Sequence, residues 1–141
     1  MSRESLRRTL AALIDGGLVG RNPGYGHPLR PEYVLTTRGE RIAARSGPLV
    51  QLLRARGLEE VGLKKWSMPV VYALADEPLR FSELREALQG ISPRALTLAL
   101  KELEAVGVVE RTVTRDYPPS TVYGLSDDAR PLAAAVRRIA G

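Results

Sequence analysis

Apolar residues between positions 63 and 107 recur every three or four places, which is the spacing of one buried helix face. Three runs show this spacing, with apolar positions Trp66, Val70 and Leu74; Leu84 and Leu88; and Leu96, Leu100 and Leu103. Serines stand ahead of or early in these runs as expected N-caps: Ser67, Ser82 and Ser92. Glycines end the second and third runs, at Gly90 and Gly107. The pattern predicts three helices, with the short turn LQGIS between the last two.

The period changes to two after Gly107, which indicates strands. VVERTVT, RDYPPS and TVYGLS, residues 108–126, predict a β-hairpin with a proline-containing tip. Helical spacing returns over residues 127–140. Three helices followed by a hairpin is the order of a winged helix-turn-helix. The predicted fold class is therefore mainly α with small β-hairpin wings, in which the polar outer side of the third helix fits a DNA major groove.

The beginning of the chain repeats part of this pattern. SRESLRRTLAALIDGGLVGR, residues 2–21, aligns without gaps on SPRALTLALKELEAVGVVER, residues 92–111, ninety positions later. One register kept over some thirty residues indicates an internal duplication. Residues 2–16 then correspond to the third helix, 18–35 to the wing and 37–46 to the helix that follows it. The first two helices have no counterpart in this copy.

Two domains are therefore expected: a partial winged-helix repeat over residues 1–56 and a complete winged helix-turn-helix over 57–141. SGP at 46–48 is expected to break the chain before a new helical stretch at 49–56, and RGLEEVG at 56–62 reads as a linker or helix end. A tandem two-domain protein is the natural parent. Either Met1 is an internal start within a longer frame or the truncation is natural, and the sequence leaves both open.

Composition narrows the function. The 141 residues carry a net charge of +5, which suits a phosphate-rich partner. Cysteine is absent, which excludes disulfides, thiol sensing and cysteine–zinc sites, and His27 alone cannot build a metal site. No cofactor, metal or catalytic cluster is expected, so the protein is not read as an enzyme. No stretch approaches a membrane span or a signal-peptide core, and the expected location is the cytoplasm.

KKWSMPVVYAL, LRFSELREALQGISPRALTLALKELEAVGVVER and YPPSTVYGLS together resemble the HxlR-type winged-helix transcriptional regulators of bacteria, over residues 63–136. The resemblance implies duplex DNA binding and control of transcription, with repression expected, by a homodimer whose terminal helices form the interface. The chain departs from the family where half a domain replaces the usual helix ahead of Lys-Trp. It also departs at Leu98 and Ala99, where the family usually has polar or basic residues.

The reading helix is expected over residues 92–105, with its apolar side buried. Its predicted DNA-facing positions are Ser92, Pro93, Arg94, Thr97 and Lys101, with Leu98 on the same side. Arg94 and Thr97 are placed to reach base edges, and Lys101 a phosphate. Arg111 and Arg115 of the wing are predicted to lie along the DNA, whereas Tyr117 and Tyr123 are read as wing packing. The alternative is that Ser92-Pro93 is only a good helix start and Arg94 a solvated charge.

The partial copy is richer in arginine on its outer side. The predicted DNA-contacting residues there are Arg3, Arg7, Arg8, Arg21 and Arg30. The partial copy lacks the two scaffold helices, so its leucine stripe has an incomplete surface to pack against. A second chain is expected to cover part of it in an obligate dimer, and the predicted dimer-interface residues are Leu49, Leu52, Leu53, Leu132, Val136 and Ile139. The alternative is that each helix packs only within its own chain.

Two functions from different classes remain open. The first is a DNA-binding transcriptional regulator. The second is a winged-helix protein–protein interaction module that has lost DNA reading, as the apolar Leu98 would allow. RNA binding has little support because no aromatic platform for unpaired bases is apparent. The operator and the direction of regulation are not readable from the residues, and a small-molecule effector stays open.

Overall fold

A computed structural model describes residues 2–25 and 30–140, with side chains described over 2–21 and 33–140. Contacts divide the chain into two compact units, Met1–Arg45 and Ser46–Gly141. The division falls inside helix α2 (Thr37–Ala55), ahead of the boundary that we expected between residues 56 and 57.

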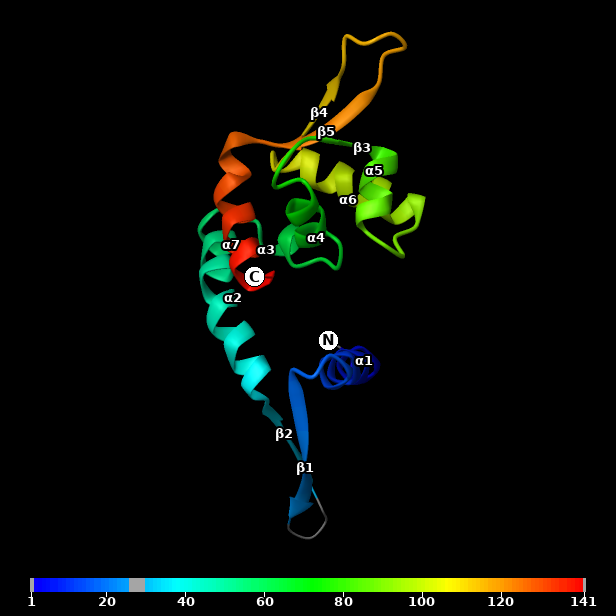
Figure 1. Cartoon of the computed structure of the whole chain (residues 1–141). Helices are drawn as coiled ribbons and strands as arrows, with labels where there is room; N and C mark the ends of the chain where they lie inside the picture. The colour runs from blue at the N-terminus through cyan, green and yellow to red at the C-terminus, as the bar shows by residue number, and fades with distance from the viewer. Residues whose placement is uncertain (1, 26–29, 141) are drawn as a thin grey trace. The chain divides into compact units, whose positions relative to one another are not determined.

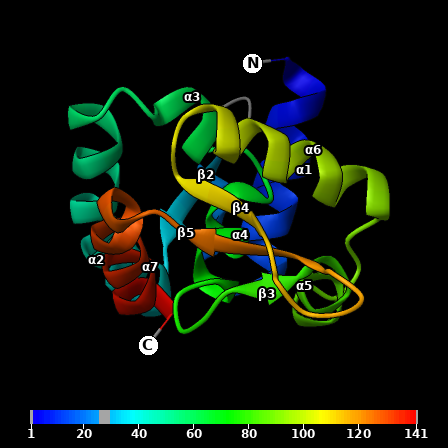
Figure 2. The same cartoon turned by 90° about the horizontal axis from the view of Figure 1, so that it is seen from above.

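Unit 2, Ser46–Gly141, has the element order of a winged helix-turn-helix (Figure 1). Its elements after α2 are α3 (Glu59–Gly62), α4 (Ser67–Ala73), β3 (Leu79–Arg80), α5 (Phe81–Ala87), α6 (Pro93–Ala105), β4 (Val109–Val113), β5 (Thr121–Leu125), a 3₁₀ turn (Asp127–Ala129) and α7 (Arg130–Ala140). The antiparallel sheet has the order β3-β5-β4, so the hairpin gains a third, very short strand (Figure 2). The predicted fold class of unit 2 is confirmed.

The core of unit 2 forms around α4, which packs against α5, α6 and α7. Val70 and Val71 of α4, Leu84 of α5, Leu96 of α6 and Leu132 of α7 are all fully buried, with 0% of each residue exposed. Each element therefore contributes a residue at its predicted apolar spacing. Burying a side chain of this size is worth about 1.5–3 kcal/mol, so this set fixes how α6 is presented.

Local signals placed α6 correctly. The Ser92 hydroxyl oxygen accepts from the backbone N–H of Ala95 at 3.1 Å, and Pro93 is the first helical residue, as expected. Gly107 ends the turn after the helix with φ of +78°, a left-handed conformation that costs glycine little. The Val108 N–H then donates to the Leu103 carbonyl at 2.9 Å. The chain thus leaves α6 directly into the first strand of the wing.

The caps of the two preceding helices differ from the prediction. Ser67 lies inside α4 and is 2% exposed, and its hydroxyl donates to the Val61 carbonyl at 2.6 Å. Trp66 takes the N-cap position instead. Helix α5 begins one residue before Ser82, and the Glu83 carboxylate accepts from the Arg80 N–H at 2.9 Å. Both serines were plausible caps, but a tertiary partner and a nearby carboxylate supplied the bonds.

One other expectation about the path of the chain was wrong, and two short elements were not foreseen. SGP at 46–48 does not break the helix, because α2 continues through Pro48. The segment at 56–62, expected to be a linker or helix end, contains the short helix α3, and Leu79–Arg80 forms the strand β3 against Val122 and Tyr123. Such short elements carry no periodicity of their own, so neighbouring structure decides them.

Unit 1, Met1–Arg45, contains α1 (Arg3–Asp15), β1 (Val19–Tyr25), β2 (Arg30–Leu35) and the start of α2. Strands β1 and β2 form an antiparallel pair in which Val19 faces Leu35 and Arg21 faces Tyr33. In unit 2 the corresponding pairs are Val109 with Leu125 and Arg111 with Tyr123. The register of the two hairpins is therefore the same at their helix-proximal ends.

The hydrogen bonds at the junction of helix and hairpin also correspond. In unit 1 the Thr36 hydroxyl donates to the Gly17 carbonyl at 2.6 Å, and the Leu18 N–H donates to the Leu13 carbonyl at 2.9 Å. In unit 2 the Ser126 hydroxyl donates to the Gly107 carbonyl at 2.7 Å. Gly17 has φ of +74°, close to the +78° of its counterpart Gly107. The two segments thus share their local geometry, not only their sequence pattern.

Candidate nucleic-acid interface

The outer face of α6 carries the side chains that the sequence placed there. Pro93, Arg94, Thr97, Leu98 and Lys101 are exposed, and together they line a surface hollow of about 410 Å³. The opposite face holds Leu96, Leu100 and Leu103 in the core. The helix therefore separates a fully apolar inner side from an outer side with two cations.

Hydrogen bonds within α6 decide which side chains of this face are free to donate a hydrogen bond to a base. The Thr97 hydroxyl donates to the Pro93 carbonyl at 2.8 Å, and the Ser92 hydroxyl caps the helix. Both hydroxyl oxygens retain acceptor capacity, but donation to a base would require Thr97 to change rotamer. Arg94 and Lys101 are then the strong donors of this face, and Arg94 alone has the planar fork that suits a guanine edge.

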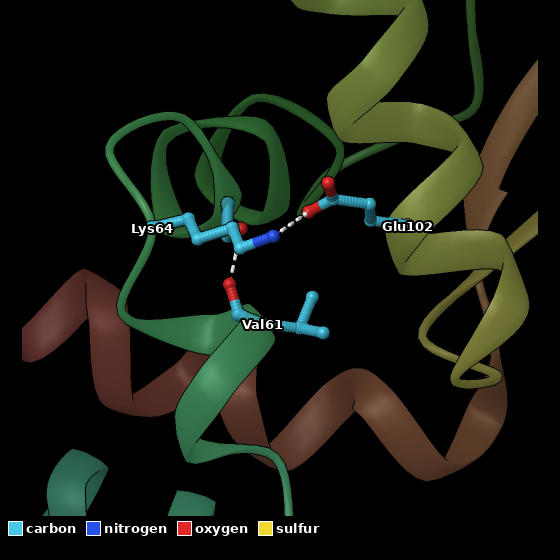
Figure 3. Close-up of polar contacts among 4 residues, drawn as sticks. Val61, Lys64 and Glu102 are labelled. Atoms are coloured by element: carbon cyan, nitrogen blue, oxygen red, sulfur yellow. Dashed lines mark hydrogen bonds and ion pairs between the residues drawn. The ribbon is translucent and has the colours of Figure 1, made fainter.

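The segment ahead of α4 is tied to α6 by an ion pair that sequence reasoning missed. The Lys64 ammonium lies 2.8 Å from the Glu102 carboxylate (Figure 3). Lys64 belongs to the same turn as Val61, whose carbonyl accepts the buried Ser67 hydroxyl. The two residues lie 38 positions apart, so no local spacing rule could have found the pair.

A second, smaller hollow adjoins the first. It has a volume of about 210 Å³ and is lined by Lys64, Lys65, Trp66, Ser67, Ala95, Leu98, Ala99 and Glu102. Leu98, which is 57% exposed, lines both hollows. Ala99 is only 9% exposed and belongs to the core. Of the two positions at which the sequence departs from the family, Leu98 is therefore the one on the exposed outer face.

The wing offers further exposed polar and aromatic groups. Arg111 on β4 and Arg115 near the tip are both exposed. Tyr123 is half-buried and packs against the core, as expected. Tyr117 is 100% exposed at the tip, so its reading as a packing residue was wrong.

In unit 1, Arg3, Arg7 and Arg8 on α1 and Arg21 on β1 are exposed, as predicted. The side chain of Arg30 and the whole of His27 lie outside the described residues. Within the described parts of unit 1, α1 therefore presents three cations. What it lacks is a buried side, because α1 has no buried residue.

Most of the predicted interface leucines are used inside unit 2. Leu49, Leu53, Leu132 and Val136 are at most 9% exposed, while Leu52 and Ile139 remain partly exposed against the core. A groove of about 500 Å³ lies beside them, lined by Pro48, Gln51 and Leu52 of α2 and Pro131, Ala134, Ala135 and Arg138 of α7. A second chain could therefore reach this groove but not the buried leucines.

Other kinds of site are not found among the residues that the structure describes. They contain no group of three or more metal-ligating side chains. None of the described helices has the length and apolarity needed to cross a membrane. The candidate binding groups on the described surface are the exposed cations of α6, α1 and the wing.

The three-helix core, the capped outer helix and the adjoining hairpin define a winged helix-turn-helix protein. Residues 61–141 match the family of HxlR-like helix-turn-helix proteins. The chain belongs to this family, and the resemblance noted from its motifs is confirmed.

Similar proteins agree with this assignment. An uncharacterised HTH-type transcriptional regulator of Halalkalibacterium halodurans is 44% identical over 69 residues, which cover 48% of this chain and 61% of that protein. The HTH-type transcriptional regulator YodB of Bacillus subtilis is 34% identical over 76 residues, covering 54% of this chain and 68% of YodB. The chain therefore spans about three fifths of the first relative's length.

Among solved structures, the redox regulator HypR in its oxidised form aligns with a TM-score of 0.56 and 34% identity, covering 62% of this chain and 90% of HypR. Diamide-treated YodB from B. subtilis aligns with a TM-score of 0.52 and 32% identity, covering 57% of this chain and 80% of YodB. These alignments cover little more than half of this chain.

Proposed function

We propose that this protein is a DNA-binding transcriptional regulator that reads duplex DNA with α6 and its β4–β5 wing. The observation that carries the proposal is the exposed outer face of α6, where Arg94 and Lys101 flank a hollow and the opposite face is locked in the core. An α-helix presented in this way fits the width of the major groove. The named relatives and the family match support the same function.

Each contact has a distinct role in the proposal. Arg94 makes a base contact, most favourably to guanine, and Leu98 makes an apolar contact with a thymine methyl group. Lys101 and the wing arginines neutralise phosphates, which adds affinity without reading sequence. Ser92 places the N-terminus of α6 towards the backbone, where the helix dipole favours an anion. Tyr117 at the wing tip is an additional contact.

We further propose that the protein is a homodimer formed through the groove between α2 and α7. The groove is lined mostly by apolar residues, with Gln51 and Arg138 as its polar members, and buried residues of the same two helices, including Leu49 and Val136, belong to the core. A two-fold dimer would set two reading helices about 34 Å apart, one DNA turn. We expect repression, because a dimer covering a promoter excludes polymerase from the same DNA.

The sequence contains no cysteine, so any signal that this protein receives does not act by thiol oxidation. HypR is described as a redox regulator. A thiol-based switch would require a cysteine, which this sequence lacks. A small-molecule effector or no effector at all is therefore the proposal for this chain.

The test is fluorescence anisotropy with DNA from the protein's own upstream region, against a scrambled duplex of equal length. We expect tighter binding to the upstream DNA and a linear fall of log K with log salt, with a slope of about −0.9 for each phosphate neutralised. A reporter fused to the same region should rise when the gene is deleted. Equal, salt-insensitive signals on both duplexes at low salt would contradict DNA binding.

The exposure of Leu98 favours a second candidate, a winged-helix interaction module. At 57% exposed, this leucine sits on the reading face itself, where it would suit an apolar protein partner as well as a base. Leu98→Arg separates the two functions. It should strengthen non-specific DNA binding if the face lies on DNA, and abolish binding if the partner is an apolar protein surface.

A further inference from the structure

The lysines of this arginine-rich chain gather at one place in unit 2. The sequence has lysine only at positions 64, 65 and 101. Lys101 lines the larger hollow on the outer face of α6, and Lys64 and Lys65 line the smaller one. Leu98 lines both hollows, so the lysines of the two hollows meet at this residue. Because the lysine ammonium is a compact point charge that binds phosphates, this grouping indicates a phosphate-binding surface beside Arg94.

The turn ahead of α4, residues 63–66, lies against one flank of α6. It shares the smaller hollow with Ala95, Leu98 and Glu102 of that helix. An α-helix with its side chains is about 10–12 Å across, and the DNA major groove is about 12 Å wide. When α6 lies in the groove, its flanks therefore face the two sugar–phosphate backbones. The turn is then placed beside one of these backbones.

The two lysines of the turn have different partners. The Lys64 ammonium lies 2.8 Å from the Glu102 carboxylate, so the two charges neutralise each other (Figure 3). Lys65 is exposed, and none of the described carboxylates pairs with it. Its ammonium lies 5.2 Å from the centre of the Trp66 ring, within the range of a cation–π contact. Such a contact holds the ammonium in place and leaves its charge available to an anion.

We infer that Lys65, held by the Trp66 ring, is a phosphate anchor that binds the DNA backbone beside α6. The Lys64–Glu102 pair neutralises a carboxylate that would otherwise repel the same backbone. The inference rests on the proposed function, since it needs α6 to lie in the major groove, and it adds a contact outside both α6 and the wing. A phosphate contact positions the protein without reading sequence, so Lys65 strengthens binding to every duplex.

The first experiment measures the anisotropy of the upstream and scrambled duplexes with Lys65→Ala at several salt concentrations. We expect both duplexes to bind more weakly, and the salt slope to fall by about 0.9. The loss of affinity at about 50 mM salt should then be about three to four times the loss at about 200 mM. Lys65→Arg keeps the charge and should keep the slope, and Lys65→Gln repeats the test with a longer neutral side chain. Arg85→Ala, which removes one exposed cation from α5, is the matched control and should change neither quantity.

The second experiment changes the charge of the ion pair. Glu102→Gln frees Lys64 for the backbone, so it should tighten binding to both duplexes and steepen the slope by about 0.9. The double variant Lys64→Met, Glu102→Gln replaces a neutral pair with another and should keep the slope of the unmodified chain. Trp66 is the chain's one tryptophan, so bound DNA should protect its fluorescence from iodide. Thermal unfolding shows that each variant is folded.

The outcomes separate this inference from the proposed function. Binding by the unmodified chain with an unchanged affinity and slope in Lys65→Ala would overturn the phosphate anchor alone. A loss confined to the upstream duplex would make Lys65 a base-reading residue and would also overturn it, as would unchanged iodide quenching of Trp66. No binding of either duplex by the unmodified chain would overturn the proposed function and this inference with it.

Discussion

The Lys64 ammonium and the Glu102 carboxylate form an ion pair of 2.8 Å that joins the turn ahead of α4 to the side of α6 (Figure 3). Glu102 lies one position after Lys101 of the reading face, so the pair constrains the rotation of α6 about its axis. Half of the Lys64 side chain and 24% of the Glu102 side chain are exposed. Because solvent screens such a pair, its contribution is to orientation more than to stability.

Replacing Glu102 with glutamine removes the charge and keeps the shape. We expect Glu102→Gln to lower the free energy of unfolding by less than about 1 kcal/mol, with the loss shrinking at high salt. Urea unfolding of Lys64→Met, Glu102→Gln and the double variant gives the coupling energy of the pair. A coupling that is unchanged between low and high salt would contradict this electrostatic account.

The two copies of the leucine stripe should respond differently to truncation. Leu96→Ala leaves a cavity in a closed core and should cost about 2–5 kcal/mol of unfolding free energy. Leu6→Ala removes a side chain that is already half exposed, so it should cost well under half as much. Chemical denaturation followed by Trp66 fluorescence reports the first, and exchange of α1 amides reports the second. Equal losses would mean that the face of unit 1 is covered.

Replacing Arg94 by alanine and replacing Lys101 by alanine should have different effects on DNA binding. Arg94→Ala should cost about 1–3 kcal/mol on the preferred duplex and reduce discrimination against a scrambled one. Lys101→Ala should weaken both duplexes alike and reduce the salt slope by about 1. Anisotropy titrations at several salt concentrations measure both quantities. The control is Arg85→Ala on the exposed side of α5, which should change neither.

The N-cap of α6 is open to a direct test. Ser92→Ala removes the acceptor for the Ala95 N–H and should lower stability by about 1 kcal/mol. Ser92→Asp keeps an acceptor and should restore most of it, but it should weaken DNA binding by placing a negative charge beside the backbone phosphates. Thermal unfolding and DNA titration together separate the two roles. Normal DNA affinity in Ser92→Asp would place this helix end away from the DNA.

The groove between α2 and α7 predicts the effect of a charge at Ala134. Ala134 is exposed and lines the groove, so Ala134→Glu should leave the monomer folded and shift a dimer towards monomers by tenfold or more. Sedimentation equilibrium over micromolar concentrations measures the shift. Ala87→Glu, at an exposed position of α5, is the matched control. An unmodified chain that sediments as a monomer throughout would contradict the dimer.

Sequence by itself determined the elements whose signals are local. The period of the leucines, the Ser92-Pro93 start and the glycine exit set the bounds of α6, because each acts through bonds within a few residues. The change of period set the hairpin, and the ungapped alignment of residues 2–21 on 92–111 pairs Gly17 with Gly107, whose carbonyls accept matching bonds in the structure. The outward side of α6 followed from the same spacing.

Tertiary structure decided what depends on distant partners. Ser67 lies inside α4, where its hydroxyl donates to the Val61 carbonyl and does not cap the helix, and Glu102 has an ion-pair partner 38 positions away. Ala99 and the leucines of α2 and α7 became core because neighbouring helices closed over them. Leu6 stayed exposed although its sequence setting matches that of Leu96. Burial is a property of what packs on a face, and that partner lies outside the pattern that predicts the face.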